Sequence, residues 1–152
     1  MSPAAQLATL LLEHLKMAGK PDLDEVCRAL GLRVREKDLV GFEGTLVRSR
    51  TAQKGIIGVK RSVREVSRKR FTVAHEIGHS ELGDDPEAGP PMQIEPARSA
   101  EPSPVGLDRV VDYGRRQRRE VQMDLFAREF LLPREFVRQL HLAENLSATE
   151  IA

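Results

Sequence analysis

Two histidines four residues apart, with a glutamate directly after the first, constrain this chain more than any other feature. Residues 75–79 read His-Glu-Ile-Gly-His and lie within a segment, 63–82, whose apolar residues recur with the period of a helix. Side chains four residues apart on a helix point the same way, with Cβ atoms about 5–6 Å apart. Both imidazoles can then bind one zinc ion at about 2.0–2.1 Å. The spacing therefore predicts a helix that carries a metal site.

The glutamate between the histidines indicates hydrolysis. Glu76 lies about 100° around the helix from His75, which is too far to share its ligand direction but near enough to reach a metal-bound water. Zinc lowers the pKa of such a water to about 7. Glu76 can take its proton, so that the hydroxide attacks a peptide carbonyl, and can pass that proton to the leaving amine. An accidental match is the alternative, but histidine is rare and chance matches to this motif are uncommon.

A catalytic zinc also needs a third protein ligand and an open position. No further histidine follows closely, as it does in metzincins, so we expect an acid on another helix. Segment 117–132 predicts that helix, because it has a broad apolar face and Pro133 ends it. Glu120 and Asp124 share its other face. In a gluzincin-like arrangement, Glu120 is the ligand and Asp124 accepts the outer N–H of a zinc histidine. The alternative for both is a solvated helix face.

The rest of the chain predicts an α+β fold. Two amphipathic helices, 3–18 and 22–30, are expected first, and each is followed by a glycine. The period then changes to two, which predicts three short strands with close turns, at 32–35, 45–48 and 55–60. We expect a small, mostly antiparallel, three-stranded sheet. If the last strand lies at an edge, it could receive a substrate as an added strand.

Composition shifts suggest the domain organisation. Residues 84–106 are rich in proline and are expected to form a mobile insert near the substrate cleft of the predicted metal site. Ser147 and Glu150 form a capping box for a helix that has barely begun when the sequence stops. We therefore expect a metallopeptidase domain at 1–142 and the start of a truncated C-terminal region at 143–152.

Composition also limits location and partners. The single cysteine, Cys27, cannot form an internal disulfide or a cysteine-rich metal site, so reduced cytoplasm is the expected compartment. No apolar run approaches the roughly 18 residues of a membrane span, and the N-terminus lacks the charged start of a signal peptide. The net charge of +1 argues against direct binding of nucleic acid, although a helix-turn-helix could begin beyond residue 152.

Two segments together resemble the ImmA/IrrE metallopeptidases. Residues 70–79 read RFTVAHEIGH, and residues 120–133 read EVQMDLFAREFLLP. The resemblance covers about residues 5–140, and the two signatures occur in the family's order. It implies a zincin-like fold with zinc as the cofactor, or manganese as an alternative. It also implies that His75, His79 and Glu120 are the metal ligands and that Glu76 is the catalytic acid/base.

The resemblance further implies a regulatory protease. Members of this family are typically bacterial, phage or mobile-element proteins that often relieve repression by cutting a helix-turn-helix repressor, as in stress-response switches. This chain departs from the family pattern in three places. Met123 stands where a small alanine is usual, the methionine usual between Leu132 and Pro133 is missing, and the gap between residues 79 and 120 is longer. A rival function keeps the metal but not the cleavage: a regulatory module that sequesters a transcription regulator.

Two further features carry less specific information. Tyr113, the only tyrosine, precedes the Glu120 helix and could donate a hydrogen bond to the oxyanion of the tetrahedral intermediate. Packing in a loop is the alternative. Arginine and lysine cluster at 115–119 and at 68–70. Such clusters are usually solvated helix faces, and the functional alternative is an electropositive rim that attracts an acidic segment.

Overall fold

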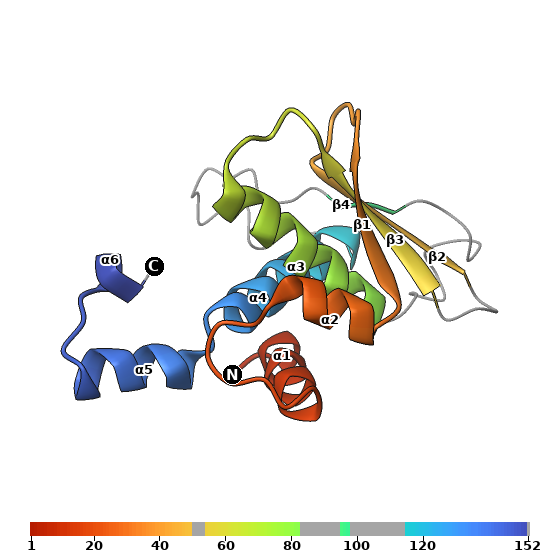
Figure 1. Cartoon of the computed structure of the whole chain (residues 1–152). Coiled ribbons are helices and arrows are strands. Elements are labelled where there is room, and N and C mark those ends of the chain that lie inside the picture. Colours follow the sequence, from red (N-terminus) through yellow and green to blue (C-terminus); the bar gives the residue numbers. More distant parts are fainter. Residues whose placement is uncertain (50–53, 83–94, 98–114, 152) are drawn as a thin grey trace.

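The computed structural model describes residues 1–49, 54–82, 95–97 and 115–151. These residues form an α+β structure, as the sequence predicts (Figure 1). In chain order the elements are α1 (Pro3–His14), α2 (Leu23–Ala29), β1 (Leu32–Lys37), β2 (Gly44–Ser49), β3 (Lys54–Lys60), α3 (Val66–Leu82), β4 (Glu95–Ala97), α4 (Arg115–Leu131), α5 (Arg134–Ala143) and α6 (Ala148–Ile151).

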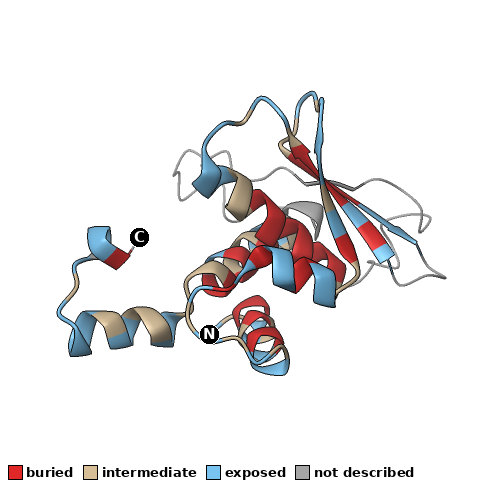
Figure 2. Ribbon diagram, in the orientation of Figure 1, coloured by how far each residue is buried: buried red, intermediate tan, exposed pale blue. Residues whose placement is uncertain are grey.

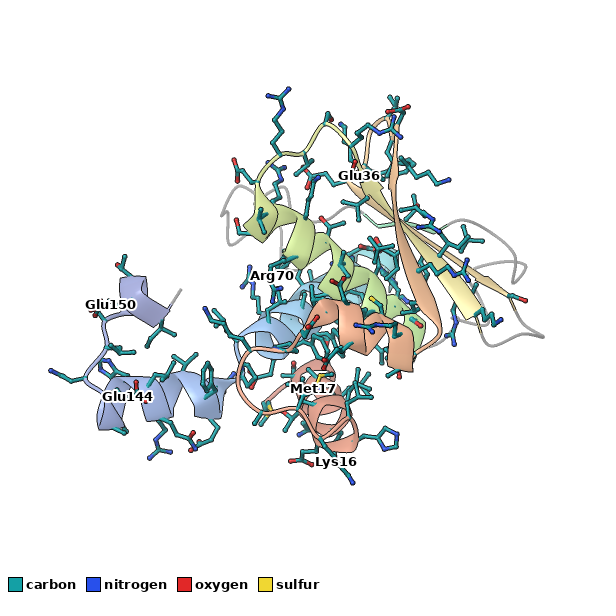
Figure 3. All side chains as sticks on the ribbon, in the orientation of Figure 1. Lys16, Met17, Glu36, Arg70, Glu144 and Glu150 are labelled. Carbon is teal, nitrogen blue, oxygen red and sulfur yellow. The ribbon has the colours of Figure 1, made fainter. Side chains whose placement is uncertain are left out.

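Side-chain caps define where the first two helices begin. The hydroxyl of Ser2 accepts the N–H of Ala5 at 3.2 Å, and the carboxylate of Asp22 accepts the N–H of Asp24 at 2.9 Å. Helix α1 packs against α4, and α2 packs against β1. Arg70 of α3 donates to the backbone carbonyl of Pro21 at 3.3 Å, which ties the α1–α2 connection to the metal-motif helix (Figure 3).

The sheet is mixed and has the order β1-β3-β2-β4. Strand β3 pairs in parallel with β1 and antiparallel with β2, and β2 pairs antiparallel with β4. β3 is not an edge strand, so the condition for adding a substrate strand at 55–60 is not met. β2 and β3 form a hairpin, and β1 occupies the free side of β3, so the backbone groups of β3 are bonded on both sides. The parallel pairing depends on a non-local contact that the local period does not report.

The proline-rich segment predicted at 84–106 lies outside the described residues except for Glu95–Ala97. Those three residues form β4, which the sequence did not predict. The predicted boundary at 142–143 stays a prediction. Near it, α5 has no buried residue and extends away from the sheet (Figure 1).

One face of the sheet and the helices enclose the core. Figure 2 shows the buried residues concentrated where α3 lies between the sheet and α4. Phe126 and Phe130 of α4 are fully buried and stacked, with ring centroids 5.3 Å apart. Cys27 belongs to this core, and burial raises the pKa of its thiol to about 11, so it serves as a small apolar residue. Within the described residues, no helix combines the length and apolar character that crossing a membrane requires.

Candidate metal centre

The two histidines of the motif lie side by side on α3 and are turned into the protein. His75 is 0% exposed and His79 is 3% exposed. Their ring centroids are 5.0 Å apart, as expected for residues one helical turn apart on one face. Side chains of this polarity are rarely buried unless they have partners.

Helix α4 supplies one carboxylate to both histidines. Oε2 of Glu120 lies 3.0 Å from Nε2 of His75, and Oε1 lies 3.3 Å from Nε2 of His79. Asp124, one turn further along α4, places its Oδ1 2.8 Å from Nδ1 of His75. The structure thus brings together the four residues that the sequence picked out on two separate helices.

The protonation of these groups follows from their mutual contacts. Burial lowers the pKa of His75, but hydrogen bonds to Asp124 and Glu120 and the nearby charge of Glu76 outweigh burial and raise it to about 9. Burial raises the pKa of Glu120, but hydrogen bonds to His75 and His79 outweigh that effect and lower it to about 2. The carboxylates therefore favour a positive charge among these side chains.

A divalent metal fits this group of residues. One ligand atom from each of His75, His79 and Glu120 lies within 4.8 Å of the others. Neighbouring ligands of a tetrahedral zinc with bonds of 2.0–2.1 Å are about 3.3 Å apart, close to the 3.0 Å and 3.3 Å contacts that Glu120 makes. Two imidazoles and one carboxylate form a donor set typical of catalytic zinc, which keeps its fourth position open.

Glu76 lies beside these ligands under the sheet and is 0% exposed. Strand β2 passes close to it: a Cβ built on Gly44 would be 2.7 Å from Oε1 of Glu76 and 2.5 Å from Cγ2 of Thr72. Only a residue without a side chain fits there. Sequence reasoning misses the contact of Gly44 with Thr72 and Glu76, because local periodicity carries no signal for a contact between a strand and a distant helix.

We expect Gly44→Ala to disturb Glu76 more than it disturbs the fold. The added methyl group should cost about 1–3 kcal/mol of unfolding free energy and should displace the Glu76 carboxylate, lowering activity with the zinc content unchanged. Thr72→Ser in the same chain removes the closest clashing atom and keeps the hydroxyl bond to the carbonyl of Arg68, so it should restore part of the stability. Urea unfolding and metal analysis of the single and double variants test this. Equal stability of Gly44→Ala and the unaltered chain would contradict it.

A second glycine sets the distance between the two ligand helices. A Cβ on Gly78 would be 2.9 Å from Cδ1 of Phe126 and 3.0 Å from Sδ of Met123. Both α4 side chains are fully buried and therefore have little room to move. Gly78 thus allows α4 to approach α3 closely enough for Glu120 to contact both histidines.

Gly78→Ala should therefore weaken folding and metal binding together. We expect a loss of about 1–3 kcal/mol in the unfolding free energy of the metal-free protein, with a lower zinc affinity because α4 is pushed away from α3. Adding Met123→Ala withdraws the sulfur atom and should recover part of the loss. Denaturant unfolding in a chelator, followed by zinc titration, measures both effects. An unchanged unfolding midpoint would show that moving α4 away from α3 does not lower the unfolding free energy.

Glu129 is a buried acid of α4 that has a separate partner. Glu129, on the opposite side of the predicted helix from Glu120, is buried elsewhere, and its Oε1 accepts the N–H of Arg134 at 3.0 Å at the start of α5. It thereby replaces the side-chain cap that Pro133 cannot provide. Tyr113 lies outside the described residues, so its role stays a prediction.

Comparison with known proteins agrees with this geometry. Residues 27–101 match the family model of the M78 peptidases, described as the IrrE N-terminal-like domain. The match includes the two histidines and Glu76, and it ends before the α4 carboxylates. No curated protein matches the chain. Residues 27–101 are thus an IrrE N-terminal-like domain of the M78 (ImmA/IrrE) metallopeptidases, and this match together with the His-His-Glu group indicates a metalloendopeptidase.

Proposed function

We propose that the chain is a zinc-dependent endopeptidase in which His75, His79 and Glu120 hold the metal. The observation that carries this proposal is the convergence of their three ligand atoms beside a glutamate on the same helix. Asp124 accepts a hydrogen bond from Nδ1 of His75, which fixes the ring so that Nε2 faces the metal position. Zinc is the proposed metal because of this donor set, and manganese is the alternative.

Glu76 is the proposed general base and acid. When bound, zinc supplies Lewis-acid polarisation of the scissile carbonyl and lowers the pKa of water. The Glu76 carboxylate takes one proton from the attacking water as the new C–O bond forms. It returns that proton to the amine nitrogen as the C–N bond breaks, so the carboxylate ends the cycle as it began. Tyr113 remains our candidate donor to the oxyanion, and Tyr113→Phe should then lower kcat more than it changes KM.

A helix-turn-helix transcriptional repressor is the proposed substrate, cut in the cytoplasm as part of a stress-response or mobile-element switch. Family membership supports this choice, since the site itself is compatible with any peptide. A non-cleaving regulatory module is the second candidate. The complete burial of both His75 and Glu76 favours it, because a group that does chemistry on a polypeptide must be reachable.

Metal analysis combined with a cleavage assay separates the two candidates. The purified chain should contain about one zinc per molecule and should cut a candidate repressor at a discrete position. A chelator should stop cleavage, and added zinc should restore it. Stable binding of the repressor without cleavage in every metal condition would support the sequestering module and reject the peptidase. Failure to bind either zinc or manganese would reject both.

A further inference from the structure

The face of the sheet that is turned away from α3 and α4 carries a concentration of positive charge. Successive side chains of a strand alternate between faces, and Leu32 and Ile57 point into the core. The alternate positions on β1 and β3 therefore lie on the opposite face, which no helix of the described chain covers (Figure 1). Five of them are basic and we call them the basic face: Arg33, Arg35, Lys37, Lys54 and Lys60.

The register places these cations close together. Arg33 lies opposite Ile56, Arg35 opposite Gly58, and Lys37 opposite Lys60. Like charges directly opposite each other on neighbouring strands are destabilising, so this arrangement does not stabilise the isolated sheet. The whole chain has 24 basic and 23 acidic residues. The basic face is therefore a local concentration of charge and does not reflect the overall composition.

Nearby acids do not neutralise the basic face. Glu36 alternates to the other side of β1 and bonds Lys69 at 2.7 Å (Figure 3). In the flanking turns, Asp38 pairs with Arg61 at 3.4 Å and Glu43 pairs with Arg68. Among the described residues, no ion pair joins the five cations of the basic face to an acidic side chain.

Two exposed aliphatic side chains lie beside these cations. Ile56 of β3 and Val47 of β2 are directly opposite partners in the antiparallel register and are 43% and 37% exposed. Arg33 flanks Ile56 on its other side. Apolar side chains next to charged groups are a common composition of protein interfaces.

We propose that the basic face and the Ile56–Val47 pair form a docking surface for an acidic, amphipathic helix of a partner protein. Carboxylates on one side of such a helix match the five cations, and its aliphatic residues match the apolar pair. Single-stranded nucleic acid suits the surface less well, because the strands that form it present no aromatic side chain on which bases could stack. The surface lies across the sheet from the metal ligands, so a partner held there leaves their side of the sheet free.

A binding assay with a defined probe tests this inference without relying on peptidase activity. The probe is a fluorescent peptide of about 15 residues, long enough for partial helix formation, with glutamate and leucine in adjacent stripes on one side of the helix. We expect binding that weakens with salt. Arg33→Glu combined with Arg35→Glu should weaken it at least about tenfold, and Val47→Ser with Ile56→Ser should also weaken it. Arg128→Glu with Arg138→Glu, which reverses two exposed charges on α4 and α5, is the matched control and should bind normally.

Three results would overturn the proposal. The first is no binding by the unaltered chain. The second is equal loss in the control and in the basic-face variants. The third is that a DNA duplex displaces the probe and binds more tightly, which would make the surface a nucleic-acid site. Thermal unfolding and zinc content of each variant establish that it is folded. Because zinc binding is measured separately, failure of peptide binding and failure of the metal site can be distinguished.

Discussion

Glu76→Gln is expected to abolish cleavage while leaving about one zinc bound per chain. Glutamine has nearly the same shape as glutamate, so it should fit the space beside Gly44 and Thr72. Its amide cannot accept the proton of the attacking water. General acid–base catalysis contributes roughly 10²–10⁴-fold, and the rate should fall by at least that factor. Single-turnover cleavage of the substrate, with metal analysis of the same sample, measures both quantities.

The matched control for this variant lies five residues further along α3. Glu81→Gln makes the same chemical change outside the metal ligands, at a carboxyl group whose pKa is raised mainly by burial. It should cleave at close to the unaltered rate. If Glu76→Gln retained full activity, the general base would have to be another residue. If both variants lost activity equally, the effect would belong to the helix and not to Glu76.

The helices were predictable because their signals are local. The helical period, the acid at Asp22 and the proline at 133 are read within a few residues of each element. The central position of β3 and its parallel pairing with β1 were not predictable in this way. Pairing joins residues that are more than twenty positions apart, such as Leu32 and Gly55, and neither strand's sequence specifies the partner. The short strand β4 was hidden for a different, local reason, since proline is expected to interrupt strands.

The candidate metal site was predictable to the level of which helix faces meet. A spacing of four placed His75 with His79, and Glu120 with Asp124, on common faces. The sequence could not show that both carboxylates contact the same histidine, one at each ring nitrogen. That detail depends on how closely α4 approaches α3, which in turn depends on the missing side chain at Gly78. The packing of α4 against α3 joins residues far apart in the sequence. It therefore determines how the two local sequence motifs combine into one site.

Glu120→Ala should remove stoichiometric zinc, whereas Asp124→Ala should retain zinc with an affinity reduced by about 10–100-fold. Glu120 contacts Nε2 of both histidines, so its loss removes one of three ligands. Asp124 contacts only the far nitrogen of His75. Its loss frees the ring to reorient but leaves the ligand set intact.

Zinc titration against a competing chelator orders these variants, with Gln122→Ala as the control on the same helix. Gln122 is partly exposed, and its substitution should leave the affinity unchanged. Activity at saturating zinc adds a second criterion: Asp124→Ala should recover cleavage as zinc is raised, and Glu120→Ala should not. Equal zinc retention by Glu120→Ala and Asp124→Ala would show that the metal is held elsewhere. A greater loss of zinc affinity in Asp124→Ala would show that Asp124 is the ligand and that Glu120 orients the histidine. Only the predicted order agrees with one carboxylate bridging two imidazoles and the other orienting one of them.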